Sequence, residues 1–330
     1  MLRTAVMIKN LPHFSDAQIL AARPPKQLVD PRRPYACLLE EEYSARGQLE
    51  QVATIFLTNR ECPFRCLMCD LWRNTTDDSV AEGDIPAQFD VAFEELAIEA
   101  AVKSGGIAQV KLYNSGNFFD AQAIARQDWP GIADRLVTCQ TTIVENHPRL
   151  CNDDCLQFRN SLQGELEIAL GLETVHPEIL PRLNKQMTLI DFQRAVEFLR
   201  DHEISVRAFI LLKPPSLDEE EGVQWAIRSL EYAFEVGVQC CSVIPTRPGN
   251  GIMEQLQDQG IFQPPDVHSM ERVLAAGLQM EQGRVFMDLW DAEQFCPCPE
   301  CGSARLQRLE TMNKTQQVLP AVECSQPGCG

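Results

Sequence analysis

The sequence predicts an α/β fold built on a parallel sheet. Along most of the 330 residues, short runs rich in β-branched and aliphatic side chains alternate with segments whose apolar residues recur at helical spacing. Such alternation favours parallel strands joined by right-handed crossovers. The hydrophobic content of 45% is that of a globular chain with a substantial core. Periodicity alone leaves a barrel and an open doubly wound sheet as alternatives.

Six strands are expected in chain order, at residues 52–58, 107–113, 136–144, 165–172, 204–212 and 239–244. The expected helices are 89–102, a polar helix containing Cys151 and Cys155, then 189–202, 223–236 and 267–280. Gly105 and Gly106 end the first helix, because glycine commonly terminates helices. Ser216 followed by Glu219 has the pattern of a capping box. Residues 1–50, with several prolines, are expected to form an N-terminal extension packed on the barrel.

Composition limits the compartment and the partners. Fourteen cysteines indicate a reducing compartment with metal sites, since disulfide frameworks belong to small secreted domains. No N-terminal signal pattern and no long apolar run is visible, so we expect a soluble, cytoplasmic protein without a membrane partner. The net charge of -18 argues against extensive wrapping of nucleic acid, whose phosphates are normally met by Lys and Arg. Binding of nucleic acid at a local basic patch around the opening of the site remains an alternative.

Three cysteines, Cys62, Cys66 and Cys69, follow the first predicted strand with the spacing C-x3-C-x2-C. Three thiolates from one loop can hold three irons of a four-iron cubane, which leaves the fourth iron open to a ligand. The carboxyl end of a barrel strand is also where α/β barrels carry their chemistry. The alternatives are a zinc knuckle or three unrelated buried thiols, although intracellular cysteine clusters usually indicate metal binding or catalysis.

This motif resembles the cluster motif of the radical S-adenosylmethionine (SAM) superfamily, with a core of the Elp3, MiaB and NifB type. The resemblance implies a partial (β/α)6 barrel of TIM type and a [4Fe-4S] cluster whose open iron chelates SAM. It also implies reductive cleavage to a 5'-deoxyadenosyl radical and an external reductant such as ferredoxin or flavodoxin. The residue before the third cysteine, usually aromatic and close to the adenine, is Met68 here, which is an apolar and flexible replacement.

Other cofactor contacts are expected at strand ends. Asn114, Ser115 and Gly116 stand where the superfamily has a glycine-rich segment that receives the amino group of SAM, although the usual Gly-Gly-Glu is absent. A simple turn is the alternative reading of these three residues. Glu145 ends the third predicted strand and resembles the acidic strand end of the Elp3, MiaB and NifB branch.

The fourth predicted strand alternates glutamates with aliphatic residues, so its polar face can line a lumen. Glu167 or Glu173 would then hold the ribose hydroxyls or the amino group of the cofactor; a wet edge strand is the alternative. Arg207 on the fifth strand could pair with a carboxylate of cofactor or substrate. It could equally form an ion pair with those glutamates.

Longer phrases resemble a radical SAM branch that includes the archaeosine-forming subunit, over about residues 50–330. The sequence segments that carry this resemblance are residues 111–120, 171–178, 183–188, 211–215 and 308–313. The branch implies chemistry on a lysine-bearing deazaguanine in tRNA, with a transglycosylase-like partner. We therefore predict a radical SAM enzyme that abstracts hydrogen from its substrate, with lyase and transferase reactions both open. A radical SAM enzyme for a small molecule or peptide, or a non-catalytic zinc-binding scaffold, are the alternatives.

The C-terminal segment carries two further cysteine pairs, Cys298 with Cys301 and Cys324 with Cys329, each followed by glycine. A tetrahedral zinc site of ribbon type is the simplest fit, because so short a tail needs a metal to hold it. Cys296 is a spare ligand, and an auxiliary iron-sulfur cluster is the alternative. The expected organisation is an N-terminal extension at 1–50, a barrel at 51–290 and a small cysteine-rich metal-binding tail at 291–330.

Overall fold

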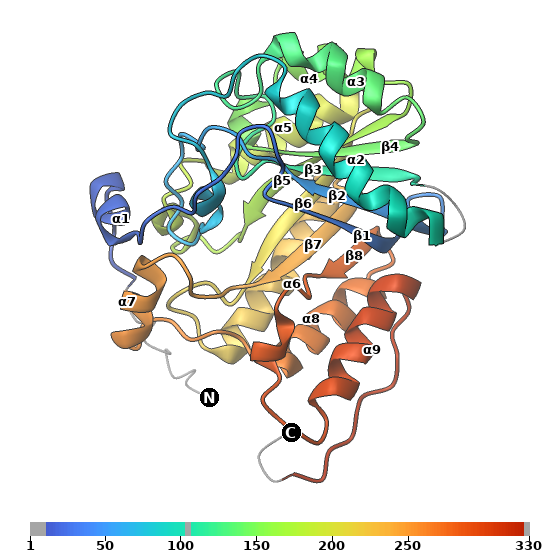
Figure 1. Ribbon diagram of the computed structural model, residues 1–330. Coiled ribbons are helices and arrows are strands. Elements are labelled where there is room, and N and C mark those ends of the chain that lie inside the picture. Colours follow the sequence, from blue (N-terminus) through green and yellow to red (C-terminus); the bar gives the residue numbers. More distant parts are fainter. Residues whose placement is uncertain (1–10, 103–106, 327–330) are drawn as a thin grey trace.

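The computed structural model describes residues 11–102 and 107–326. One curled sheet of eight strands, with the strand order β1-β2-β3-β4-β5-β6-β7-β8, forms the centre of the protein (Figure 1). β1 pairs with β2 in antiparallel fashion, and the pairs from β2 to β8 are all parallel. The strands are β1 (Ala36–Tyr43), β2 (Leu49–Phe56), β3 (Gln109–Tyr113), β4 (Thr141–Asn146), β5 (Glu165–Glu173), β6 (Ser205–Leu212), β7 (Cys240–Pro245) and β8 (Arg284–Met287).

The helices are α1 (Asp16–Ala22), α2 (Asp84–Val102), α3 (Trp129–Arg135), α4 (Asp153–Ser161), α5 (Leu189–Asp201), α6 (Glu219–Glu235), α7 (Ile252–Asp258), α8 (Val267–Gln279) and α9 (Gly302–Thr315). Most of them flank the sheet on its outer side, whereas α1 and α7 lie apart from that layer and α9 lies beside the edge strands β1 and β8 (Figure 1). Asp218 caps α6 and forms the capping box with Glu221. The box expected from Ser216 and Glu219 is therefore wrong by two residues, because Ser216 adopts a positive φ of 78° in the turn before the helix.

The predicted partial TIM-type barrel of the α/β class is confirmed, with two strands beyond the six expected. β1 escaped prediction because an antiparallel hairpin partner breaks the strand-helix alternation, and β8 because it has only four residues. β1 lies within residues 1–50 and is part of the sheet. The expected glycine end of α2, Gly105 and Gly106, lies outside the described residues.

Two hydrophobic clusters position the site. The larger one packs the outer face of the sheet against its helices. The smaller one joins Leu67, from the loop of three cysteines, to Leu11, Ile19, Leu183 and Met253. The loop is thereby anchored to the N-terminal segment, to the chain after β5 and to α7. Among the described helices, none combines the length and apolar character that a bilayer span requires.

Candidate functional site

The concave side of the sheet encloses a cavity of about 1750 Å³. Cys62, Cys66 and Cys69 line one end of this cavity, and α9 lines another part of its wall. Pockets for small ligands commonly measure about 300–1,000 Å³, so this cavity has room for a cofactor together with a substrate. We call residues 62–69 the cluster loop.

Backbone contacts from distant segments hold the cluster loop. The Leu67 amide donates to the Leu183 carbonyl at 2.8 Å. The Asn250 side-chain amide donates to the carbonyls of Leu67 at 2.7 Å and of Cys69 at 3.2 Å. These contacts fix the backbone of the loop at Leu67 and Cys69, between and beside its second and third cysteines.

The side chain of Asn117 donates to the Cys62 sulfur at 3.1 Å. A Cβ atom on Gly116 would lie 3.2 Å from the Cβ of Cys62, so a side chain there would press against that cysteine. Phe64 stacks on His147 with ring centroids 3.8 Å apart. Burial lowers the pKa of His147 to about 3, and its neutral ring donates through Nε2 to the Lys185 carbonyl at 2.9 Å. His147 therefore has a structural role in positioning the loop.

The donor set of the cluster loop suits an iron-sulfur cluster. Burial raises the pKa of Cys66 to about 12 and also raises the pKa values of Cys62 and Cys69, while the Lys185 ammonium opposes the rise at Cys66 and Cys62. Buried thiols of this kind become thiolates when a positively charged metal centre coordinates them. Hydrogen bonds to ligand sulfurs, of the kind that Asn117 donates to Cys62, are a usual part of iron-sulfur sites.

The predicted contact residues Asn114, Ser115, Gly116 and Glu145 lie together next to Cys62. The Glu145 Oε1 accepts hydrogen bonds from the backbone amides of Asn114 at 2.6 Å and Gly116 at 3.3 Å. Burial raises the pKa of Glu145 to about 7. Both polar atoms of the Asn114 side chain are buried and lack a hydrogen-bond partner among the described residues. Ser115, Gly116 and Glu145 line the large cavity, whereas Asn114 is not among the residues that line it.

Glu173 lies at the end of β5 in an ion pair with Lys185, at 2.6 Å. The strand register shifts between Gly171 and Glu173, and Glu173 adopts a positive φ of 65°. Gly171 leaves room for the pair, because a Cβ there would overlap both charged groups. Sequence reasoning missed Lys185, although it stands in one of the phrases that carried the resemblance. Met68, Gly171, Glu173 and Lys185 all line the large cavity.

Glu167 and Arg207 belong to a buried charge network deeper in the barrel. Arg207 pairs with Glu167 at 2.6 Å and with Glu42 at 2.5 Å, and Arg284 pairs with Glu167 at 2.7 Å. Burial alone would raise the pKa of Glu167, but Arg207 and Arg284 hold it below its usual range. The ion-pair alternative for Arg207 is thus what the structure contains. Glu42 and Arg284 escaped sequence analysis because their strands, β1 and β8, were not predicted.

Aromatic side chains form one wall of the cavity. Phe56 is the centre of this group, with ring centroids 5.9 Å from Tyr113, 5.5 Å from Tyr35 and 6.3 Å from Trp290. Phe209 continues the row at 6.1 Å from Tyr113. Trp290 remains 61% exposed. Such a wall offers both ring faces and ring edges to a planar ligand.

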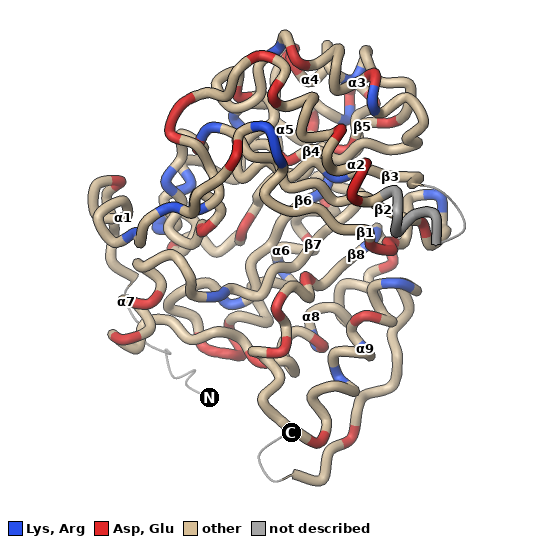
Figure 2. The backbone as a smooth tube through the Cα atoms, viewed as in Figure 1, with Lys and Arg blue, Asp and Glu red and all other residues tan. Residues whose placement is uncertain are grey.

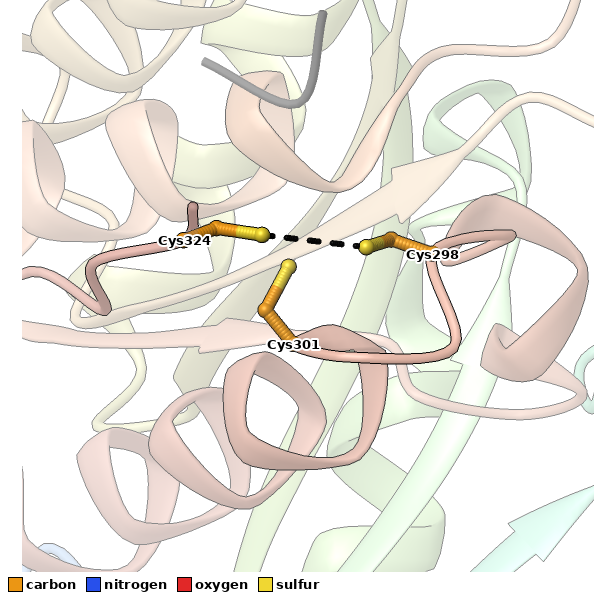
Figure 3. A group of neighbouring side chains, drawn as sticks. All are labelled: Cys298, Cys301 and Cys324. Carbon is orange, nitrogen blue, oxygen red and sulfur yellow. Dashed lines mark hydrogen bonds between the residues drawn. The ribbon is translucent and has the colours of Figure 1, made fainter. Parts of the chain in front are cut away.

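A second thiol site lies at the start of α9 (Figure 3). The sulfurs of Cys298, Cys301 and Cys324 lie within 4.8 Å of one another, and those of Cys298 and Cys324 are 3.8 Å apart. Among the described residues, only this group brings three possible ligand atoms so close together. Cys329, the expected fourth ligand, lies outside the described residues. Cys296 and Cys298 line the large cavity.

Sequence comparison finds curated relatives of this chain. No protein-family model matches the chain. An uncharacterized protein of Methanocaldococcus jannaschii is 24% identical over 91% of this chain and 86% of its own length. Archaeosine synthase subunit beta of Methanosarcina acetivorans is 27% identical over 63% of this chain, and that of Thermococcus kodakarensis 26% over 56%. The chain spans only 60% and 59% of the lengths of these two subunits.

Solved structures of similar fold include Methanocaldococcus infernus Elp3, 16% identical, with a TM-score of 0.48 over 61% of this chain and 51% of that one. The hydrogenase maturase HydG of Carboxydothermus hydrogenoformans is 15% identical, with a TM-score of 0.49 over 76% of this chain and 56% of that one. The sequence relatives thus agree with the resemblance noted in the sequence: the chain is similar to archaeosine synthase subunit beta over somewhat more than half of its length.

Proposed function

We propose that this chain is a radical SAM enzyme that abstracts a hydrogen atom from a substrate held in its barrel. The observation that carries the proposal is the position of Cys62, Cys66 and Cys69 in the wall of a cavity with room for cofactor and substrate. The three cysteines would hold a [4Fe-4S] cluster. A reduced cluster of this kind supplies the electron for reductive cleavage of SAM. Ferredoxin or flavodoxin would reduce it in a reducing cytoplasm.

The residues around the cluster loop would bind the cofactor by charge and hydrogen bonding. Glu145 lines the cavity and suits the amino group, since a buried carboxylate is stabilised by a cation. Lys185 suits a carboxylate, and Glu173 suits either ribose hydroxyls or the amino group. Ser115, Gly116 and Met68 complete the surface on this side of the cavity.

For the substrate, we propose a deazaguanine base in tRNA. The aromatic wall suits a planar heterocycle, and two relatives are named as subunits of archaeosine synthase. Acidic and basic residues are interspersed along the described chain (Figure 2), and the net charge is -18, so tRNA would have to be presented by a partner of transglycosylase type. The same charge favours a second candidate, a small molecule or peptide substrate bound by this chain alone.

Anaerobic reconstitution tests the chemistry. The wild-type chain is loaded with iron and sulfide, reduced with dithionite in the presence of SAM, and assayed for 5'-deoxyadenosine by chromatography. We expect the nucleoside from the wild type and from Cys151→Ala, and neither cluster nor nucleoside from Cys66→Ala. A normal cluster in Cys66→Ala would refute the proposed ligand set. Binding of tRNA only when a transglycosylase-type subunit is added would support the tRNA substrate, and failure under both conditions would favour a small molecule.

We further propose that Cys298, Cys301 and Cys324 bind Zn²⁺. Tetrahedral zinc with bonds of about 2.3 Å to sulfur separates its thiolates by about 3.8 Å, which is the spacing between Cys298 and Cys324. The Arg305 guanidinium donates to the Cys301 sulfur at 3.2 Å and would offset part of the thiolate charge. Elemental analysis should find about one zinc per chain. Extra iron and sulfide in its place would indicate an auxiliary cluster.

A further inference from the structure

The barrel has an open seam between its two edge strands. β1 hydrogen-bonds to β2 and β8 to β7, and in the described sheet no ladder joins β1 to β8. Helix α9 contacts both edges, and Figure 1 shows it beside β1 and β8. Its residues Ser303, Gln307 and Glu310 line the large cavity. The helix therefore forms part of the chamber wall where a closing strand would otherwise be needed.

Side chains from the end of α9 replace the missing strand at β8. The Val285 amide donates to Gln316 Oε1 at 2.8 Å, and its carbonyl accepts from Gln316 Nε2 at 2.9 Å. The Met287 amide donates to Asn313 Oδ1 at 2.9 Å, and its carbonyl accepts from Asn313 Nδ2 at 2.8 Å. Lys314 reaches the other edge, with its ammonium 3.2 Å from Glu41 of β1. Two carboxamides and one ion pair thus close the seam.

Packing alone holds α9 weakly in this position. Of its fourteen residues, the buried ones are Gly302, Arg305, Leu309 and Met312, so only two large apolar side chains are fully covered. Arginines supply polar contacts: Arg305 and Arg308 pair with Glu271 of α8 at 2.5 Å and 3.0 Å. They also bind the returning tail, where Arg308 donates to the carbonyl of Pro320 at 2.8 Å and Arg305 to that of Val322 at 3.1 Å. Because α9 is held mostly by polar contacts and buries little apolar surface, a link between its start and the returning tail would hold it more firmly in place.

The C-terminal thiols supply that constraint. Cys301 is the N-cap residue of α9, and Cys324 is on the tail that returns after its end, so an ion bound to both closes a loop that contains Asn313 and Gln316. Closing a loop in this way disfavours the detached conformations of the enclosed chain. Because the same helix lines the cavity, the ion would also determine the shape of the substrate chamber.

We propose that the metal at Cys298, Cys301 and Cys324 fastens α9 into the seam between β1 and β8 and so completes the wall of the chamber. The proposal rests on zinc binding at these thiols, but it does not depend on radical chemistry at the cluster loop. It predicts that loss of the metal exposes particular backbone amides of β8. Those amides are Val285 and Met287, whose hydrogen-bond acceptors belong to residues 313 and 316.

Hydrogen exchange resolved to single amides tests the proposal. The experiment uses full-length Cys66→Ala, so that a failure of cluster chemistry cannot affect the result. Zinc is removed with a chelator and then restored, and Cys298→Ser is added in a parallel variant. We expect the amides of Val285 and Met287 to exchange about tenfold faster or more without zinc and to recover when zinc is restored. The amides of Arg284 and Asp288 are internal controls, because they donate to the carbonyls of Gln239 and Val243.

Two further variants complete the test. Asn313→Leu with Gln316→Leu should keep its zinc and still show fast exchange at Val285 and Met287, and Cys151→Ala should show wild-type zinc content and exchange. Unchanged exchange after complete zinc removal would overturn the proposal. Equal acceleration at Arg284 and Asp288 would also overturn it, because the effect would then be general unfolding. Absence of bound zinc, with no absorption from added Co²⁺, would refute the metal site and with it this proposal. The proposed chemistry at the cluster loop is a separate question and would not be affected by that result.

Discussion

The Lys185 ammonium lies 2.6 Å from the Glu173 carboxylate, and both groups line the cavity beside the cluster loop. A buried positive charge stabilises the more negative, reduced form of a nearby cluster, and a negative charge destabilises it. Lys185→Met should therefore lower the reduction potential of the reconstituted cluster, and Glu173→Gln should raise it. Redox titration followed by electron paramagnetic resonance measures both. Lys213→Met, which removes a buried lysine paired with Glu219, is the control. Shifts of the same sign in the two test variants would contradict this electrostatic role.

Gly171→Ala should disturb the same ion pair without unfolding the barrel. The new methyl group would overlap the carboxylate of Glu173 and the ammonium of Lys185, which are ends of flexible side chains. We expect a changed reduction potential with a loss of only about 1–2 kcal/mol in unfolding free energy, measured in urea. Gly164→Ala should destabilise the fold more, because there the methyl group meets the backbone carbonyls of Cys139 and Gln140. Equal stability losses in both variants would argue against a local effect.

Glu145 should make the stability of the cofactor-free chain depend on pH. Burial raises its pKa from 4.5 to about 7, so the folded state binds a proton more tightly than the unfolded chain does. The resulting stabilisation is complete below pH 4.5 and is lost as the pH rises through 7. Glu145→Gln removes this dependence, and its stability relative to wild type should rise by up to about 3 kcal/mol between pH 5 and pH 8. Urea unfolding across that range checks it, with Glu231→Gln on the exposed face of α6 as control. A difference in unfolding free energy between Glu145→Gln and wild type that does not change with pH would contradict this prediction.

Arg207→Met should be strongly destabilising. Arg207 is 2% exposed and pairs with Glu42 and Glu167, so its removal leaves two buried carboxylates short of a counter-charge. Breaking a buried ion pair by removing one partner costs about 3–5 kcal/mol. The surface pair of Arg272 and Glu220 is exposed on both sides, and Arg272→Met should cost less than about 1 kcal/mol. Denaturant unfolding compares the two variants. A small loss at Arg207 would show that solvent reaches the network.

The sequence by itself determined the features that depend on residues close together in the chain, namely the loop of three cysteines and most of the strands. The spacing of Cys62, Cys66 and Cys69 is a property of one loop, and the positions of β2 to β7 follow from apolar runs bounded by polar turns. The alternation of strands and helices was sufficient to predict the α/β class. Glu145 and Asn114 could be found because each comes directly after, or at the end of, a predicted strand.

Tertiary structure alone decided the contacts between distant segments. Glu42 meets Arg207 only because β1 folds back onto β2 and the sheet curls, and the two residues are 165 positions apart in the chain. Lys185 reaches Glu173 from a loop, where no periodic pattern indicates the direction of a side chain. The seam covered by α9 likewise depends on where the two edge strands end. These features arise from the curvature of the sheet, which brings its edges and strand ends together and which a pattern read along the chain does not specify.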